Sequence, residues 1–130
     1  MLIFGHTYIE FTPFYHISEI SDIERTPANS TLFLEFNEAN LDIIKHLQSN
    51  KLRFALEVTN LEALVLAHNL NCTYMVVSET LAKSAQTVAE NYLFDAKILC
   101  RVQQDQALEE IILEGIDGVI YPSAIIKASL

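Results

Sequence analysis

Four polar side chains occupy equivalent places in four of five apolar segments of this sequence, each two residues before a position that can begin a helix. These side chains are Glu35, Glu57, Arg101 and Tyr121. A charge at the end of an apolar run is costly unless it is paired, so each of them requires a partner. Side chains alternate along a strand, so equivalent positions on neighbouring strands share one face. The spacing therefore predicts that two carboxylates, a guanidinium and a phenol meet at one rim.

This rim has three interpretations. In a ligand site, Glu35 or Glu57 acts as a general base, Arg101 holds an anionic group and Tyr121 donates a hydrogen bond. In a structural network, Arg101 neutralises one or both glutamates and Tyr121 completes the cluster. In the third, the glutamates face solvent from an edge strand. The structural network and the solvent-exposed arrangement are together favoured over the ligand site. The grouping also depends on strand register, because a shift of one residue in any strand turns its polar side chain to the other face.

The elements that position these residues follow from the hydrophobic pattern. Apolar runs predict strands at 31–36, 52–58, 73–78, 97–102 and 118–121. Helical spacing predicts helices at 37–50, 59–69, 81–94, 106–115 and a closing helix at 123–130. Strand starts recur about every 21 residues, which indicates βαβ units and a parallel sheet. The strands are apolar throughout, as expected when both faces of a sheet are covered.

Helix ends carry their own signals. Thr59 and Glu62 match a capping box, and Asn37 and Asp105 are suitable N-caps. Gly115 is suited to end the helix at 106–115.

The first 30 residues have a different pattern. They are rich in aromatic and β-branched residues and are interrupted by Gly5 and Pro13. This pattern predicts a β-hairpin or edge strands, followed by a connection. We therefore expect a single α/β domain over 1–130, with the hairpin and connection at 1–30 and repeated βα units at 31–130.

The segment GIDGVIYPSAII (115–126) resembles the end of phosphate-binding (βα)8 barrels such as tryptophan synthase alpha chains and indoleglycerol phosphate synthases. The resemblance extends over residues 52–127, including ALEVTNLEALVLAHNLNCTYMVV (55–77). It implies half of such a barrel, with an anion bound by backbone N–H groups at a helix start at Ser123. Pro122 stands where the family has a glycine, and proline has no N–H to donate.

Our expected fold is α/β, an open parallel sheet of about five strands flanked by helices, with the N-terminal β-hairpin at one edge. The alternative is a half (βα)8 barrel, which would leave a strand edge open and would have to dimerise.

Composition excludes several classes of function. The net charge of −9 and the lack of a basic stripe argue against nucleic acid and anionic membranes as partners. Cys72 and Cys100 lie in apolar runs, which predicts reduced thiols in a cytoplasmic protein and no disulfide. Three glycines exclude a glycine-rich phosphate loop, and the four histidines lack metal-ligand spacing, so we expect no cofactor and no metal.

For function, the sequence favours a non-catalytic module that associates with itself or with a protein partner. The 51% content of hydrophobic residues and the aromatic N-terminus support this reading. The first alternative is a small anionic metabolite bound at the strand carboxyl ends by Glu35, Glu57, Arg101, Tyr121 and Ser123. The second alternative is a lyase or isomerase of the phosphate-barrel type.

Overall fold

The structure, a computed structural model, describes residues 1–129. Its strands are β1 (Leu2–Phe4), β2 (Phe14–His16), β3 (Thr31–Glu35), β4 (Phe54–Glu57), β5 (Tyr74–Val77), β6 (Lys97–Arg101), β7 (Gly118–Ile120) and β8 (Ile125–Lys127). Its α-helices are α1 (Leu41–Ser49), α2 (Leu61–His68), α3 (Glu79–Asn91) and α4 (Leu108–Leu113). Short 3-10 helices are η1 (Ile20–Arg25), η2 (Glu38–Asn40), η3 (Asp105–Ala107) and η4 (Pro122–Ala124).

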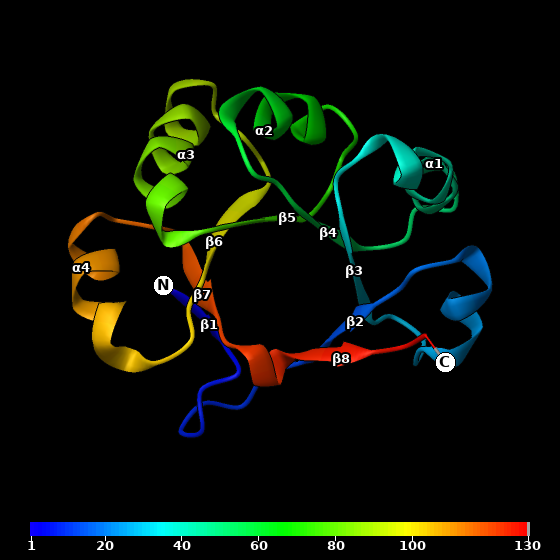
Figure 1. The fold of residues 1–130 in the computed structure, drawn as a ribbon, viewed down its shortest axis with the longest axis horizontal. Helices are drawn as coiled ribbons and strands as arrows, with labels where there is room; N and C mark the ends of the chain where they lie inside the picture. The colour runs from blue at the N-terminus through cyan, green and yellow to red at the C-terminus, as the bar shows by residue number, and fades with distance from the viewer. Residues whose placement is uncertain (130) are drawn as a thin grey trace.

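All eight strands form one parallel sheet in the order β1-β7-β6-β5-β4-β3-β2-β8. The sheet curls, and the four α-helices lie outside the curve (Figure 1). β1 and β8 are its edges. The prediction of an open parallel α/β sheet flanked by helices is thus confirmed, but the sheet is curled into a half-barrel with eight strands instead of about five.

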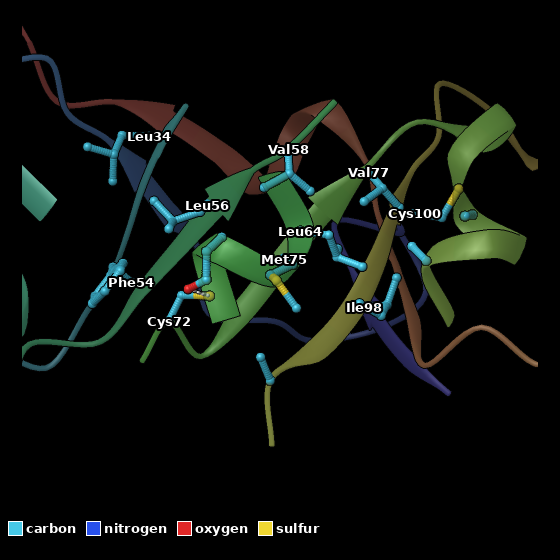
Figure 2. Close-up of a cluster of buried hydrophobic side chains, with 14 of the residues drawn as sticks. Leu34, Phe54, Leu56, Val58, Leu64, Cys72, Met75, Val77, Ile98 and Cys100 are labelled. Carbon is cyan, nitrogen blue, oxygen red and sulfur yellow. Dashed lines mark hydrogen bonds between the residues drawn. The ribbon is translucent and has the colours of Figure 1, made fainter. Parts of the chain in front are cut away.

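The main core lies between the helices and the outer face of the sheet. Figure 2 shows part of it, with side chains from β3 to β6 meeting those of α2. Leu34, Leu56, Met75 and Ile98 are each fully buried there. Every second residue of these strands joins this core, and the intervening residues face the other way. Both faces of these strands therefore carry apolar side chains, as their continuous apolar runs predict.

A smaller core fills the inside of the curve. Its buried members are Phe14, Phe33, Ala55, Val76, Leu99, Ile120 and Ala124. The rings of Phe4 and Phe14 have centroids 4.9 Å apart, and Tyr74 lies 5.6 and 5.4 Å from them. These residues come from the first, seventh and fourth strands in the sheet order. Because such distant strands touch through their side chains, the sheet must be strongly curled.

The prediction of an N-terminal hairpin is wrong. β1 pairs with β7, whereas β2 pairs with β3 and β8, and all of these pairings are parallel. Residues 2–4 and 14–16 form strands as their composition suggests, but their partners are remote in the sequence. Local pattern identifies a strand and does not identify its partner, so a turn signal such as Gly5 between two strands does not show that they pair.

The predicted closing helix at 123–130 is also wrong. η4 makes one short turn, and residues 125–127 then form β8 beside β2. Ile125 and Ile126 are β-branched and suit a strand. Tertiary contacts favour a strand over a helix for residues 125–127, because these residues pair with the edge of β2 directly after η4.

Two of the predicted caps shift. Asn60, not Thr59, caps α2, since its side chain accepts a hydrogen bond from the Ala63 N–H at 2.7 Å. Asp105 lies inside η3 and caps no helix. The Asn37 prediction is confirmed, with a 3.0 Å hydrogen bond from the Asn40 N–H. Gly115 follows α4 with φ of +71°, as expected for a residue that ends a helix.

Candidate functional site

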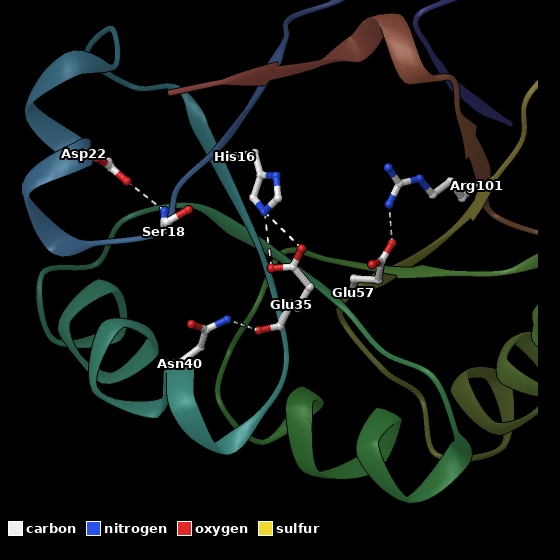
Figure 3. Close-up of polar contacts among 7 residues, drawn as sticks. All are labelled: His16, Ser18, Asp22, Glu35, Asn40, Glu57 and Arg101. Atoms are coloured by element: carbon white, nitrogen blue, oxygen red, sulfur yellow. Dashed lines mark hydrogen bonds and ion pairs between the residues drawn. The ribbon is translucent and has the colours of Figure 1, made fainter. Parts of the chain in front are cut away.

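The carboxyl ends of four strands carry polar side chains on the inner face of the sheet. His16 ends β2, Glu35 ends β3, Glu57 ends β4 and Arg101 ends β6. Glu35 and Glu57 are register partners, so their side chains stand side by side. Figure 3 shows all four side chains projecting into the same space, which we call the mouth of the sheet. Glu35, Glu57 and Arg101 therefore meet as the sequence predicts.

Arg101 and Glu57 form an ion pair at the mouth, in which Nη1 of the guanidinium donates to Oε2 of the carboxylate. The Glu57 side chain is 26% exposed, so the pair is partly withdrawn from solvent. Among residues 1–129, Arg101 makes no other side-chain hydrogen bond, so Nε and Nη2 keep donors for another acceptor. The ion pair thus orients the guanidinium without saturating it.

His16 and Glu35 form a second pair. Nε2 of His16 lies 3.1 Å from Oε1 and 3.2 Å from Oε2 of Glu35. The Asn40 side chain donates to the Glu35 backbone carbonyl at 2.7 Å and ties the end of β3 to η2. Sequence reasoning missed His16 because it placed residues 14–16 in a hairpin. With β2 in the parallel sheet, His16 pairs with Phe33 and therefore points to the same face as Glu35.

The floor of the mouth is the ring of Phe33. The His16 and Phe33 rings meet edge to face with centroids 5.1 Å apart. The Arg101 guanidinium carbon lies 5.9 Å from the centroid of the same ring. Phe33 itself is 1% exposed, so a molecule bound at the mouth would contact His16 and Arg101 and not the ring beneath them.

A cavity of about 540 Å³ opens beside the Arg101–Glu57 pair at the ends of β4, β5 and β6. It is lined by Glu57, Val58, Thr59, Ser78, Glu79, Thr80, Arg101 and Gln103. Three hydroxyls, two carboxylates, an amide and a guanidinium thus surround one space. The first turn of α3 starts at Glu79, and the first N–H groups of a helix have no partner within it. Parallel α/β sheets bind ligands at this end of their strands.

Tyr121 does not join this group. Register pairs Arg101 with Ile120, so Tyr121 faces the outer core while Ile120 faces the inner one. The Tyr121 hydroxyl donates to Oδ1 of Asp105 at 2.7 Å. Burial, followed by the hydrogen bond and the charge of Asp105, raises the pKa of Tyr121 to about 12.

Asp105 is the centre of a separate polar cluster that includes Tyr121 and His6. Oδ2 of Asp105 lies 3.3 Å from Nε2 of His6. Nδ1 of His6 accepts a hydrogen bond from the Tyr8 N–H at 3.1 Å, so the ring proton is on Nε2. Hydrogen bonds from Tyr121 and then His6 lower the pKa of Asp105. The cluster fastens the segment after β1 to the segment after β6.

Ser123 also lies apart from the mouth and has a structural contact. Its hydroxyl donates to the Gly5 carbonyl at 2.7 Å. The Ala124 N–H donates to the Tyr121 carbonyl at 3.0 Å. The resemblance to phosphate barrels implies an anion site at this position, but these two donors are used within the chain. η4 is a short 3-10 turn, so no long helix begins at Ser123.

The two cysteines lie away from solvent. Cys72 and Cys100 are free and buried, and burial raises the pKa of each thiol to about 12. Within residues 1–129, no group of three or more potential ligands is placed to hold a metal ion. The described helices include none that is long and apolar enough to cross a membrane.

No protein-family model matches this chain, and no curated protein matches it in sequence.

Proposed function

We propose that this protein binds a small polar metabolite at the mouth, in the cavity beside Arg101. The observation that carries the proposal is the cavity of about 540 Å³ that contains an oriented guanidinium with free donors. Small-molecule sites combine a concave surface with a few convergent polar groups, and this space has both. Thr59, Ser78 and Thr80 supply hydroxyls that can donate or accept.

The charges at the mouth narrow the class of ligand. Arg101 and the first turn of α3 attract one anionic group. Glu57 and Glu79 line the same cavity, and Glu35 stands beside Glu57. Three carboxylates repel a doubly charged phosphate but accept hydrogen bonds from hydroxyl or ammonium groups. The best ligand therefore carries one carboxylate together with hydroxyl, carbonyl or amino groups.

A thermal-shift screen tests this proposal with lactate, serine, pyruvate, glycerol 3-phosphate and inorganic phosphate. A ligand present at ten times its Kd stabilises the folded state by ~1.4 kcal/mol. For a domain of this size that raises Tm by about 5 °C. We expect stabilisation by at least one of the monocarboxylates and less or none by the phosphates.

Arg101→Gln tests the assignment of the guanidinium, with Lys97→Gln as its matched control. Both changes remove one positive charge from β6, but Lys97 is exposed at the opposite end of the strand. Losing a charged hydrogen-bond donor should weaken binding about 10-fold or more. Equal affinity in the two variants, or a wild-type protein that binds no member of the panel, contradicts the proposal.

We also propose self-association or binding of a protein partner as a second function. It is supported by apolar side chains that lie exposed at the ends of the neighbouring helices α3 and α4. Leu93 is 85% exposed and Leu113 is 82% exposed. The unpaired edges of β1 and β8 supply a second possible contact.

Light scattering at micromolar concentration tests the association. We expect a dimer in the wild-type protein and a shift towards monomer in Leu93→Ser combined with Leu113→Ser. A wild-type monomer contradicts self-association, and a dimer unaffected by the double change rules out this patch as the contact.

A further inference from the structure

The His16–Glu35 pair is not needed to hold the ligand in the proposed function. His16 and Arg101 approach the Phe33 ring from different strands, β2 and β6. Glu35 and Glu57 lie between them in the sheet order. The polar row at the mouth therefore runs from an imidazole to a guanidinium, and the Arg101–Glu57 ion pair spans the intervening strand β5. Figure 3 shows the free side of the imidazole directed towards Arg101.

The hydrogen bond to Glu35 determines which ring nitrogen of His16 is available. An ionised carboxylate only accepts hydrogen bonds, so Nε2 of His16 must donate to it. The neutral ring then has its lone pair on Nδ1, which makes no hydrogen bond within residues 1–129. A carboxylate that holds one nitrogen protonated orients the other as a proton acceptor.

The second histidine near this end of the sheet provides a contrast. Both ring nitrogens of His6 are used, since Nδ1 accepts from the Tyr8 N–H and Nε2 faces Asp105. His6 therefore serves as a fastening between segments. His16 is paired on one side only, and its side chain is 34% exposed. An accessible imidazole with one unpaired nitrogen suits proton transfer to a bound molecule.

We propose that the mouth catalyses proton transfer at the carbon next to the carbonyl of a bound 2-oxo acid. This inference rests on the proposed function and names its ligand class. Arg101 binds the carboxylate and the adjacent carbonyl oxygen, because a guanidinium matches two coplanar oxygens. His16 is the catalytic residue, and Glu35 is a positioning residue that acts through it.

The step balances without any co-reactant. The C3–H bond of the 2-oxo acid breaks, and its proton goes to Nδ1 of His16. The electron pair forms the C2–C3 double bond, and the carbonyl oxygen becomes an enolate oxygen. The free donors of Arg101 stabilise that negative charge as it develops. Return of the proton from His16 to C3 restores the 2-oxo acid, and its return to the enolate oxygen gives the enol, so the reaction is keto–enol interconversion.

Deuterium exchange tests the step directly with the full chain. The probes are pyruvate, 2-oxobutyrate and phenylpyruvate in D₂O, and proton NMR follows the loss of their C3 protons. We expect the wild-type protein to accelerate exchange in at least one probe. A positioned general base contributes about 100-fold or more, so His16→Gln should lose acceleration of that order.

His16→Gln is the chosen variant because its amide can still donate to Glu35 but cannot take up a proton. His46→Asn is the control, since His46 lies on α1 and has no side-chain contact with the mouth. His16→Asn serves as a second variant if the first does not fold. Binding of each probe is measured separately, from its effect on backbone amide signals near Arg101.

The outcomes separate this inference from the proposed function. A probe that binds through Arg101 but exchanges no faster than in His16→Gln overturns the inference and leaves ligand binding intact. If no 2-oxo acid binds, the inference fails, while other carboxylates in the thermal-shift panel still decide the proposed function. If His46→Asn loses as much activity as His16→Gln, His16 is not the base.

The role of Glu35 has a readout of its own. Nitrogen-15 NMR of labelled histidine distinguishes a protonated Nε2 from a protonated Nδ1. We expect His16 to carry its proton on Nε2 in the wild-type protein. In Glu35→Leu we expect a mixture of the Nε2-protonated and Nδ1-protonated forms. Glu35→Gln keeps an acceptor, so it should retain the Nε2–H form and more of the exchange activity. A predominantly Nδ1-protonated ring in the wild-type protein contradicts the inference.

Discussion

At the scale of the residue, the face of the sheet on which a side chain lies depends on strand register. Their distance from a helix start predicts that Glu35, Glu57 and Arg101 share one face, and they meet at the mouth. The same distance predicts that Tyr121 joins them, yet Tyr121 faces the outer core because Ile120 is the register partner of Arg101. The distance from strand end to helix start differs between units, so it predicts the face correctly for only some of them. Register depends on pairing with a neighbouring strand.

Replacing Tyr121 with Phe removes the hydroxyl that contributes most to lowering the pKa of Asp105. A carboxyl whose pKa is lowered by folding stabilises the protein above its ordinary value of 3.8, and this stability is lost as pH falls through the lower folded value. At pH 6, Tyr121→Phe should cost about 1 kcal/mol. Urea unfolding should show that this difference narrows between pH 6 and pH 3.

Tyr92→Phe is the control for that measurement, because Tyr92 is 73% exposed and makes no side-chain hydrogen bond in the described chain. It should have the stability of the wild-type protein at both pH values. A Tyr121→Phe difference that stays constant with pH would show that Asp105 is not the group responsible.

At the scale of the element, helices follow local signals closely, and their ends depend on which side chain reaches the free N–H groups. The sequence predicts α2 and its amphipathic spacing, but it places the cap one residue early at Thr59. In the structure Asn60 has the extended backbone of an N-cap and binds the Ala63 N–H. Threonine and asparagine are both good caps, so composition alone does not separate them. The exit direction of β4 decides between them.

Asn60→Ala should therefore destabilise the protein by about 1 kcal/mol, because it removes the acceptor for the Ala63 N–H. Thr59→Ala, one residue earlier, is the matched control and should cost less than half as much. Chemical denaturation of both variants measures the two values. A larger loss of stability in Thr59→Ala than in Asn60→Ala would show that Thr59 caps α2, as the sequence predicts.

At the scale of the whole molecule, the curl of the sheet creates the mouth. Phe4, Phe14 and Tyr74 meet inside the curve although their strands are far apart in the sheet order. A flat sheet would leave His16 and Arg101 far from a common partner. In the curled sheet both reach Phe33. The inner aromatic core is therefore the part of the packing on which the candidate site depends.

Phe14→Ala should cost about 3–5 kcal/mol, since Phe14 is fully buried among the inner aromatic rings. That is a large part of the ~5–15 kcal/mol that stabilises a typical domain. Urea unfolding at low temperature measures the loss. Tyr8→Ala is the control, because Tyr8 is 90% exposed and should matter by less than about 0.5 kcal/mol. A Phe14→Ala cost below about 1 kcal/mol would contradict a tightly packed inner core.

The sequence by itself determined the elements from β3 to β7, their parallel arrangement and the convergence of Glu35, Glu57 and Arg101. These features follow from hydrophobic period and chain order, which are local properties. Only the tertiary structure decided the pairing of β1, β2 and β8, because such short strands are stable only beside partners remote in the sequence. That pairing extends the curve and brings His16 to the mouth. The register of β7 against β6 is also a tertiary property, and it turns Tyr121 to the opposite face, since one residue of register reverses the direction of a side chain.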